Sequence, residues 1–347
     1  MRIFMKIQLR HSFENIICLE NILEAWKEFV KGKRNKYDVQ ILQMRLMDNI
    51  FSLNDELLHH TYKHCAYQAF KINDPKPRDI HKAIVRDRLL HHAIYRKLYP
   101  FFDKTFIADS YSCRLKKGTH KSIKRFKEFG YKVSKNNTQT CWILKCDIRK
   151  FFANIDHEIL LGILKEYIPD ENIIWLLEEV IKSFNTKRRN NVGLPLGNLT
   201  SQLFVNVYMN KFDQFAKHKL KAKYYIRYAD DFVIFSEDKS YLENIILKIA
   251  EFLKTQLKLE LHPDKVFIKT LYSGVDFLGW INFSDHRVLR TTTKRRIMKR
   301  IKENPSLETL NSYLGMLRHG NGSKLQSVIK KSLGEEIQGA CGQLAGK

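Results

Sequence analysis

The chain has 347 residues and a mass of 41.2 kDa, which is enough for two or three cooperating domains. Hydrophobic residues make up 44% of it and can build a substantial core, so the composition excludes a disordered chain. The 61 Lys and Arg residues outnumber the 37 Asp and Glu residues and give a formal net charge of +24. This excess indicates a polyanionic partner, with nucleic acid as the first candidate.

Membrane and disulfide-rich classes are not supported by the sequence. No apolar run reaches the roughly 18 residues that a membrane span needs, and the first residues lack the apolar core of a signal peptide. The six cysteines are scattered without a CxxC pair, so neither a zinc knuckle nor a disulfide framework is indicated. We therefore expect a cytoplasmic protein with no membrane partner.

The first part of the chain is predicted to be helical. Within residues 1–70, apolar side chains recur at helical spacing around Trp26 and again around Leu42, which indicates an N-terminal helical extension. Residues 71–84 contain two prolines and alternating isoleucines, a pattern typical of short strands around a turn. Helical periodicity resumes over residues 87–99.

Two strongly basic runs follow. Residues 114–135 hold nine basic residues and one acidic residue, and residues 287–302 hold eight basic residues and none that are acidic. A solvated helix face usually mixes both signs of charge. We therefore interpret the two runs as walls of a groove for a phosphate backbone.

The central part alternates strands and helices. Residues 141–147 form a short apolar strand, and Asp156 is placed to cap a helix over residues 156–167. Residues 224–236 predict two strands hinged on an Ala-Asp-Asp turn, with a helix over residues 242–257.

Asp230 and Asp231 stand side by side in that turn, between fully apolar strands. Like charges in such surroundings are costly, and bound cations would remove the cost. The alternative is an ordinary hairpin turn that contains Asp. Asp147 ends a separate strand and could meet Asp230 on the face of one antiparallel sheet. Such a pair predicts a two-metal site, in which Mg²⁺ ions about 3.5–4 Å apart assist an in-line phosphoryl displacement.

The order of five motifs carries a family resemblance. KCDIRKFF, GLPLGNLTSQLFVNVY, YADDFVIF, LELHPDK and VDFLGW resemble the successive palm motifs of a reverse transcriptase, in a similarity that spans residues 71–293. The sequence most resembles enzymes of diversity-generating retroelements, because Leu196 and Gln202 stand where group II intron enzymes carry a Gln and a Pro. The resemblance implies an α+β right-hand polymerase and an RNA-directed DNA polymerase, a nucleotidyltransferase.

The same resemblance implies a division into domains. It assigns residues 1–70 to the N-terminal helical extension, 71–140 to the fingers, 141–283 to the palm, with fingers helices within about 157–192, and 284–347 to the thumb.

Site residues are implied in the same way. The metal ligands would be Asp147, the backbone carbonyl of Ile148, Asp230 and Asp231, with two Mg²⁺ ions as cofactors and Mn²⁺ as the alternative ion. Lys265 would protonate the departing pyrophosphate; a solvated surface lysine is the alternative. The residues assigned to the incoming dNTP are Lys76, Arg78, Phe152, Leu196, Gly197 and Gln202. Phe152 matches the steric gate that excludes a 2′-hydroxyl, and a core aromatic beside Phe151 is the alternative.

The implied partners are an RNA template, a primer with a 3′-hydroxyl, dNTPs and the cDNA product. Similarity to diversity-generating retroelements also implies a small basic accessory protein and synthesis that is error-prone opposite template adenines. One competing hypothesis is a phage-defence reverse transcriptase. The flanking DNA would distinguish the two, because a mutagenic retroelement needs a template repeat and a near-identical variable repeat close by. The other is a nucleic-acid-binding scaffold that has lost its chemistry. The intact carboxylates and Lys265 disfavour the scaffold.

Overall fold

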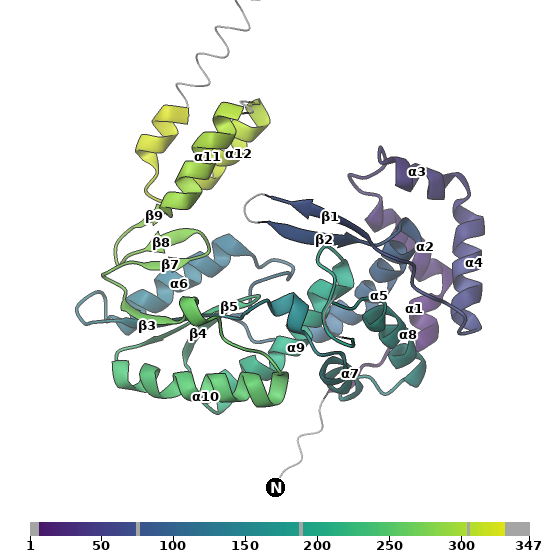
Figure 1. The fold of residues 1–347 in the computed structure, drawn as a ribbon, viewed down its shortest axis with the longest axis horizontal. Coiled ribbons are helices and arrows are strands. Elements are labelled where there is room, and N and C mark those ends of the chain that lie inside the picture. Colours follow the sequence, from purple (N-terminus) through teal and green to yellow (C-terminus); the bar gives the residue numbers. More distant parts are fainter. Residues whose placement is uncertain (1–6, 74–76, 187–189, 304–305, 330–347) are drawn as a thin grey trace, which may run out of the picture. The chain divides into compact units, whose positions relative to one another are not determined.

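The structure is a computed structural model that describes residues 7–73, 77–186, 190–303 and 306–329. The chain folds into two compact units (Figure 1). The first unit comprises residues 1–116, 146–232 and 245–266, and the second comprises residues 117–145, 233–244 and 267–347. Each unit is described by itself.

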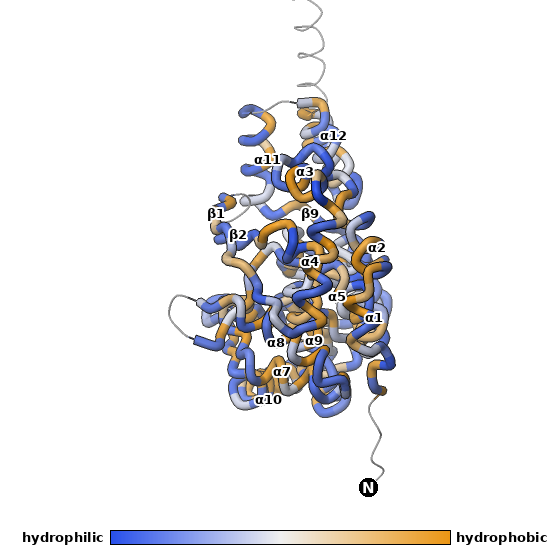
Figure 2. Tube along the Cα trace, turned by 90° about the vertical axis from the view of Figure 1, so that its right-hand side faces the viewer, coloured by the Kyte–Doolittle hydropathy of each residue, from blue (hydrophilic) through white to orange (hydrophobic). Residues whose placement is uncertain are grey.

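The first unit begins with amphipathic helices, which confirms the helical periodicity predicted for this region. These are α1 (Phe13–Ile17), α2 (Leu19–Phe29), α3 (Tyr37–Met44) and α4 (Leu46–Leu58). Along them apolar and polar segments alternate (Figure 2). Trp26 and Phe29 of α2 are buried in a shared core with Leu89 and Ala93 of α5 (Val85–Asp103). The α2–α5 packing therefore anchors the helical extension.

Between the extension and α5 lies an antiparallel hairpin of β1 (Gln68–Ile72) and β2 (Arg78–Lys82). The sequence predicts two short strands around a turn within residues 71–84. The hairpin is present, but β1 begins at Gln68, inside the region predicted to be helical. The remaining helices of this unit are α7 (His157–Lys165), α8 (Glu171–Lys182), α9 (Leu199–His218) and most of α10 (Lys239–Leu257). Most of α9 is buried, so it forms the centre of the unit.

The main sheet has four strands in the order β4-β5-β3-β6: β4 (Tyr224–Tyr228), β5 (Asp231–Ser236), β3 (Trp142–Asp147) and β6 (Phe267–Thr270). The β3–β6 pair is antiparallel, with Trp142 opposite Thr270. This order makes the strand that ends at Asp147 a neighbour of the strand that begins at Asp231. The mixed helix-and-sheet class is the one predicted.

The second unit contains α6 (Thr119–Val133) and a three-stranded antiparallel sheet of β7 (Val275–Phe277), β8 (Trp280–Asn282) and β9 (Arg287–Leu289). Two helices follow, α11 (Thr291–Glu303) and α12 (Leu307–Leu317). Together with the segment that follows α12, they form a small apolar core made by Ile297, Ile301, Leu310, Leu317, Leu325 and Ile329. None of the helices that the structure describes is long and apolar enough to cross a membrane.

Candidate active site

Asp147 and Asp230 lie beside each other in the first unit. Asp147 is the last residue of β3, and Asp230 lies in the two-residue turn between β4 and β5. The backbone N–H of Ile148 donates to the carbonyl oxygen of Asp230 at 3.1 Å. Burial raises the pKa of the Asp230 carboxyl, and the charge of Asp147 raises it further. The fold thus brings together two carboxylates that are 83 residues apart in the sequence.

The turn that carries Asp230 has an unusual backbone. Ala229 has a φ of 56°, in the left-handed region that favours glycine. Type II′ hairpin turns require a positive φ at this first central position. Because a non-glycine residue there costs free energy, the surrounding contacts must hold the turn in place.

A lysine neutralises part of the carboxylate pair. Lys265, at the end of a 3₁₀ turn (Pro263–Lys265), donates from Nζ to Oδ1 of Asp147 at 2.9 Å. The backbone also ties this segment to β3, because the N–H of His262 donates to the carbonyl oxygen of Asp147 at 2.8 Å. Lys265 also acts on Asp230, where its charge opposes the rise in pKa.

The two carboxylates fit a divalent cation by their chemistry. Both offer hard oxygen donors of the kind that Mg²⁺ prefers, and the raised pKa of Asp230 reflects a negative charge that a cation would compensate. Asp231 begins β5 and is partly exposed. Among the residues that the structure describes, no group of three or more His, Cys, Asp or Glu side chains is arranged to hold a metal ion. The role of Asp231 as a third ligand stays a prediction.

A glycine-containing loop packs against the β1–β2 hairpin. The N–H of His81 in β2 donates to the carbonyl oxygen of Leu196 at 3.0 Å, and Asn198 Nδ2 donates back to the carbonyl oxygen of His81 at 2.9 Å. Gly197 has a φ of +107°, and a Cβ there would lie 3.0 Å from Cγ2 of Ile80. A larger residue there would be strained by this backbone conformation and crowded against Ile80, so glycine favours the close approach of the loop to β2.

Arg78 shares a face of β2 with Ile80, since side chains two residues apart in a strand point to the same side. Its charge opposes the rise in the pKa of Asp230. Arg78 thus lies close enough to interact electrostatically with the Asp230 carboxylate. Lys76, assigned with Arg78 to the incoming triphosphate, lies outside the described residues.

Phe152 lies beside the same loop. It belongs to a 3₁₀ helix (Phe151–Asn154), and its carbonyl oxygen accepts a hydrogen bond from the N–H of Leu194 at 2.8 Å. Phe151 is buried, whereas Phe152 is partly exposed. This difference favours a surface role for Phe152 over core packing. Gln202 lies in the first turn of α9 and is also partly exposed.

Asp156 is a helix cap, as the sequence predicts. Its side chain accepts a hydrogen bond from the N–H of Ile159 at 3.0 Å and another from Lys258 Nζ at 2.7 Å. Both contacts are structural, so Asp156 stays outside the set of metal ligands.

Comparison with known proteins decides the family. The model of the family "Reverse transcriptase (RNA-dependent DNA polymerase)" matches residues 72–282, more than half of the chain. The chain belongs to the reverse transcriptase family. Its predicted enzyme class, RNA-directed DNA polymerase, is thereby confirmed.

The relatives of this reverse transcriptase are distant. It is 25% identical to Protein YkfC of Escherichia coli (strain K12) over 309 residues, which cover 78% of this chain and 79% of that protein. It is also 25% identical to the group II intron-encoded protein LtrA of Lactococcus lactis subsp. cremoris over 333 residues, which cover 75% of this chain and 53% of LtrA. The chain thus spans about half the length of LtrA.

A solved structure supports the fold. Telomerase from Candida albicans, solved with a fragment of telomeric RNA, superposes with a TM-score of 0.51 at 13% identity. The match covers 74% of this chain and 50% of the telomerase chain. The predicted α+β right-hand polymerase fold is confirmed.

One positioning group of the reverse transcriptase was missed in the sequence. Arg227, the fourth residue of β4, is fully buried and pairs with the equally buried Asp213 of α9. The only signal is a charged residue inside the apolar strand Tyr224–Tyr228, which by itself is costly unless the charge is paired.

Proposed function

We propose that this reverse transcriptase copies an RNA template into cDNA by two-metal phosphoryl transfer, in the error-prone synthesis of a diversity-generating retroelement. The observation that carries the chemical part is the contact between the Asp147 and Asp230 segments, where Ile148 N–H donates to the Asp230 carbonyl oxygen. Telomerase from Candida albicans, whose fold is similar, was solved with a fragment of telomeric RNA. RNA template, primer, dNTPs and cDNA are the partners proposed for this chain.

In this proposal Asp147, Asp230, Asp231 and the carbonyl of Ile148 hold two Mg²⁺ ions, with Mn²⁺ as the alternative. When bound, such ions activate the attacking 3′-hydroxyl and neutralise charge on the leaving oxygens. The ammonium of Lys265, 2.9 Å from Asp147 Oδ1, supplies a proton to the departing pyrophosphate.

The nucleotide pocket is proposed to be built from the glycine loop, β2 and the 3₁₀ helix of Phe152. Arg78 and Lys76 bind the triphosphate. The guanidinium group of Arg78 can donate two hydrogen bonds to phosphate oxygens. Phe152 packs beneath the sugar. Leu196, Gly197 and Gln202 adjoin the incoming nucleotide. The hydrogen bond from His81 to the Leu196 carbonyl supports this arrangement, because it ties the loop to the strand of Arg78.

The retroelement assignment depends on Leu196 and Gln202. With an aliphatic side chain in place of a Gln, fewer polar contacts hold the nucleotide, which reduces discrimination between correct and incorrect pairs. The assignment further proposes a small basic accessory protein and cytoplasmic synthesis. We also propose the division into an extension (1–70), fingers (71–140), palm (141–283) and thumb (284–347).

Primer extension with purified protein tests the proposal. RNA and DNA templates are compared with dNTPs or rNTPs and Mg²⁺, with and without co-expressed neighbouring proteins. RNA-templated DNA synthesis with adenine-specific errors is expected. DNA synthesis without any template would instead favour the phage-defence alternative, and no synthesis under any condition would favour the scaffold.

A further inference from the structure

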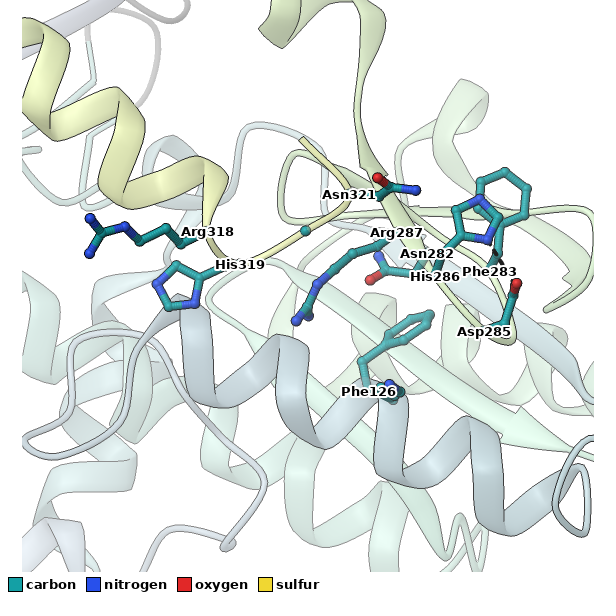
Figure 3. A pocket seen from close by; sticks show the side chains of 11 residues that line it. Phe126, Asn282, Phe283, Asp285, His286, Arg287, Arg318, His319 and Asn321 are labelled. Atoms are coloured by element: carbon teal, nitrogen blue, oxygen red, sulfur yellow. Dashed lines mark hydrogen bonds and ion pairs between the residues drawn. The ribbon is translucent and has the colours of Figure 1, made fainter. Parts of the chain in front are cut away.

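A pocket of about 390 Å³ lies within the second unit (Figure 3). It is lined by α6, by the β8–β9 hairpin and by the segment that follows α12. The N–H of Asn321 donates to the carbonyl oxygen of Arg287 at 2.9 Å, which ties the last segment to β9. A Cβ at Gly320 would clash with the Trp280 ring, so glycine is needed for this close approach. The volume falls in the range of small-ligand pockets, roughly 300–1,000 Å³.

The lining of this pocket has an excess of positive charge. Lys127 comes from α6, Arg287 from β9 and Arg318 from the end of α12. In the part of the chain that the structure describes, no carboxylate lies within ion-pair distance of any of these three. Asp285 is the one acidic side chain of the lining, and it pairs with its neighbour His286 at 2.8 Å. Three cationic side chains therefore border one small cavity, and among the described residues no carboxylate neutralises their charge.

His319 lines this end of the pocket, and His120 packs against it. The rings of His120 and His319 lie with their centroids 3.8 Å apart, and the guanidinium of Arg287 extends toward the His319 side of the pocket (Figure 3). Partial burial lowers the pKa of His319, and the charges of His120 and Arg287 lower it further. A bound anion would relieve the repulsion among these groups.

We propose that this pocket binds a phosphate monoester, either at the 5′ end of a nucleic-acid strand or on a free nucleotide or inorganic phosphate. A monoester carries between −1.5 and −2 charges near neutral pH, whereas each backbone diester carries a single charge. Three cations around one cavity match a single doubly charged group. A row of diesters needs cations spread along a line. The guanidinium group of an arginine can donate two parallel hydrogen bonds to phosphate oxygens. A neutral imidazole can donate a further hydrogen bond to the same group.

The phosphate dependence of binding by the full-length chain provides the test. Fluorescence anisotropy compares one short RNA with a 5′-phosphate and the same RNA with a 5′-hydroxyl. The phosphorylated strand is expected to bind about tenfold more tightly. Lys127→Gln and Arg318→Gln should each reduce that ratio toward one. Lys132→Gln, which removes an exposed charge from the same helix outside the pocket, should keep the ratio.

Competition separates the sources of the phosphate. Inorganic phosphate or AMP should displace only the phosphate-dependent part of the binding, and stronger displacement by AMP would identify a free nucleotide as the ligand. Equal binding of the two strands by the wild-type chain, with no displacement of either strand by inorganic phosphate or AMP, would overturn the proposal. So would variants that weaken both strands by the same factor, since the pocket would then contact the backbone. Primer extension by the wild-type enzyme on a template with a 5′-hydroxyl tests the polymerase function independently of the pocket.

Discussion

Arg227 and Asp213 form a bidentate ion pair in the centre of the first unit. The distances are 2.7 Å from Nε to Oδ1 and 2.6 Å from Nη2 to Oδ2, and both side chains are fully buried. Nη1 of the same guanidinium donates to the carbonyl oxygen of Ala229 at 3.1 Å, one residue before Asp230. The pair therefore supports the left-handed turn that presents a proposed metal ligand.

Arg227→Met should lower the free energy of unfolding by about 3–5 kcal/mol, because it leaves the Asp213 carboxylate buried without its partner. Urea unfolding measures this loss. The double variant Arg227→Met/Asp213→Leu should recover part of it. Lys211→Met, which breaks the more exposed ion pair with Glu166, provides the control and should cost less than about 1 kcal/mol. A loss in Arg227→Met as small as in the control would contradict a supporting role.

Asp147→Ala or Asp230→Ala should reduce nucleotide addition by more than about 100-fold, because each removes a proposed metal ligand. Asp230→Ala should not destabilise the fold, since burial and the charge of Asp147 already disfavour the ionised carboxylate. Primer extension and urea unfolding measure the two effects. Asp264→Ala, which removes an 87% exposed carboxylate next to Lys265, is the matched control. Extension by Asp147→Ala within tenfold of wild type would rule out the two-metal assignment.

The strand ends of the site could be predicted from the sequence, but its supporting contacts could not. Asp147 ends a mostly apolar strand, and Asp230 lies in the turn that follows an aromatic strand, so the local pattern places both residues. The contact between Lys265 and Asp147 joins residues 118 positions apart, and no local pattern encodes it. The Arg227–Asp213 pair likewise depends on how α9 packs beneath β4. A charged residue in an apolar strand predicts that a partner of opposite charge exists, but it does not identify that partner.

Stability should fall as the pH falls from about 6.5 toward 4. Burial lowers the pKa values of His64 and His91, and it lowers the pKa of His92 to about 4. The unfolded chain therefore binds more protons than the folded chain in this range, and the stabilisation present above pH 6.5 is lost on acidification. Each fully shifted histidine contributes about 1.4 kcal/mol per pH unit.

Urea unfolding at pH 7.5, 6 and 5 checks this dependence. His91→Gln should reduce the slope, because His91 is buried with its Nε2 3.2 Å from Nε2 of His64. His59 is mostly exposed, so His59→Gln should leave the slope unchanged. An equal slope in the His91 variant and the wild type would show that acid unfolding has another cause.

Phe152→Ala should admit ribonucleotides, because the proposed discrimination against the 2′-hydroxyl is steric. Single-turnover incorporation of dNTPs and rNTPs measures the selectivity. Phe151 is a matched control from the same 3₁₀ helix: it is buried, so Phe151→Ala should cost about 3–5 kcal/mol of stability without changing the preference. If both kinds of nucleotide are lost together in Phe152→Ala, the residue is core packing and the gate lies elsewhere.

Leu196→Gln tests the retroelement assignment at the position where many reverse transcriptases carry a Gln. The carbonyl oxygen of Leu196 accepts its hydrogen bond from His81 through the backbone, so the substitution should leave the loop in place. The added amide can hydrogen-bond near the incoming nucleotide, and each 1.4 kcal/mol of regained discrimination corresponds to a tenfold change in selectivity. Errors opposite template adenines should therefore decrease most.

Sequencing of cDNA made on one RNA compares the wild type with Leu196→Gln and with Leu199→Gln. The second variant makes the same change in the first turn of α9 and should keep the wild-type error spectrum. An identical adenine error spectrum in all three would show that Leu196 does not set fidelity, and would weaken the retroelement assignment without affecting the polymerase family.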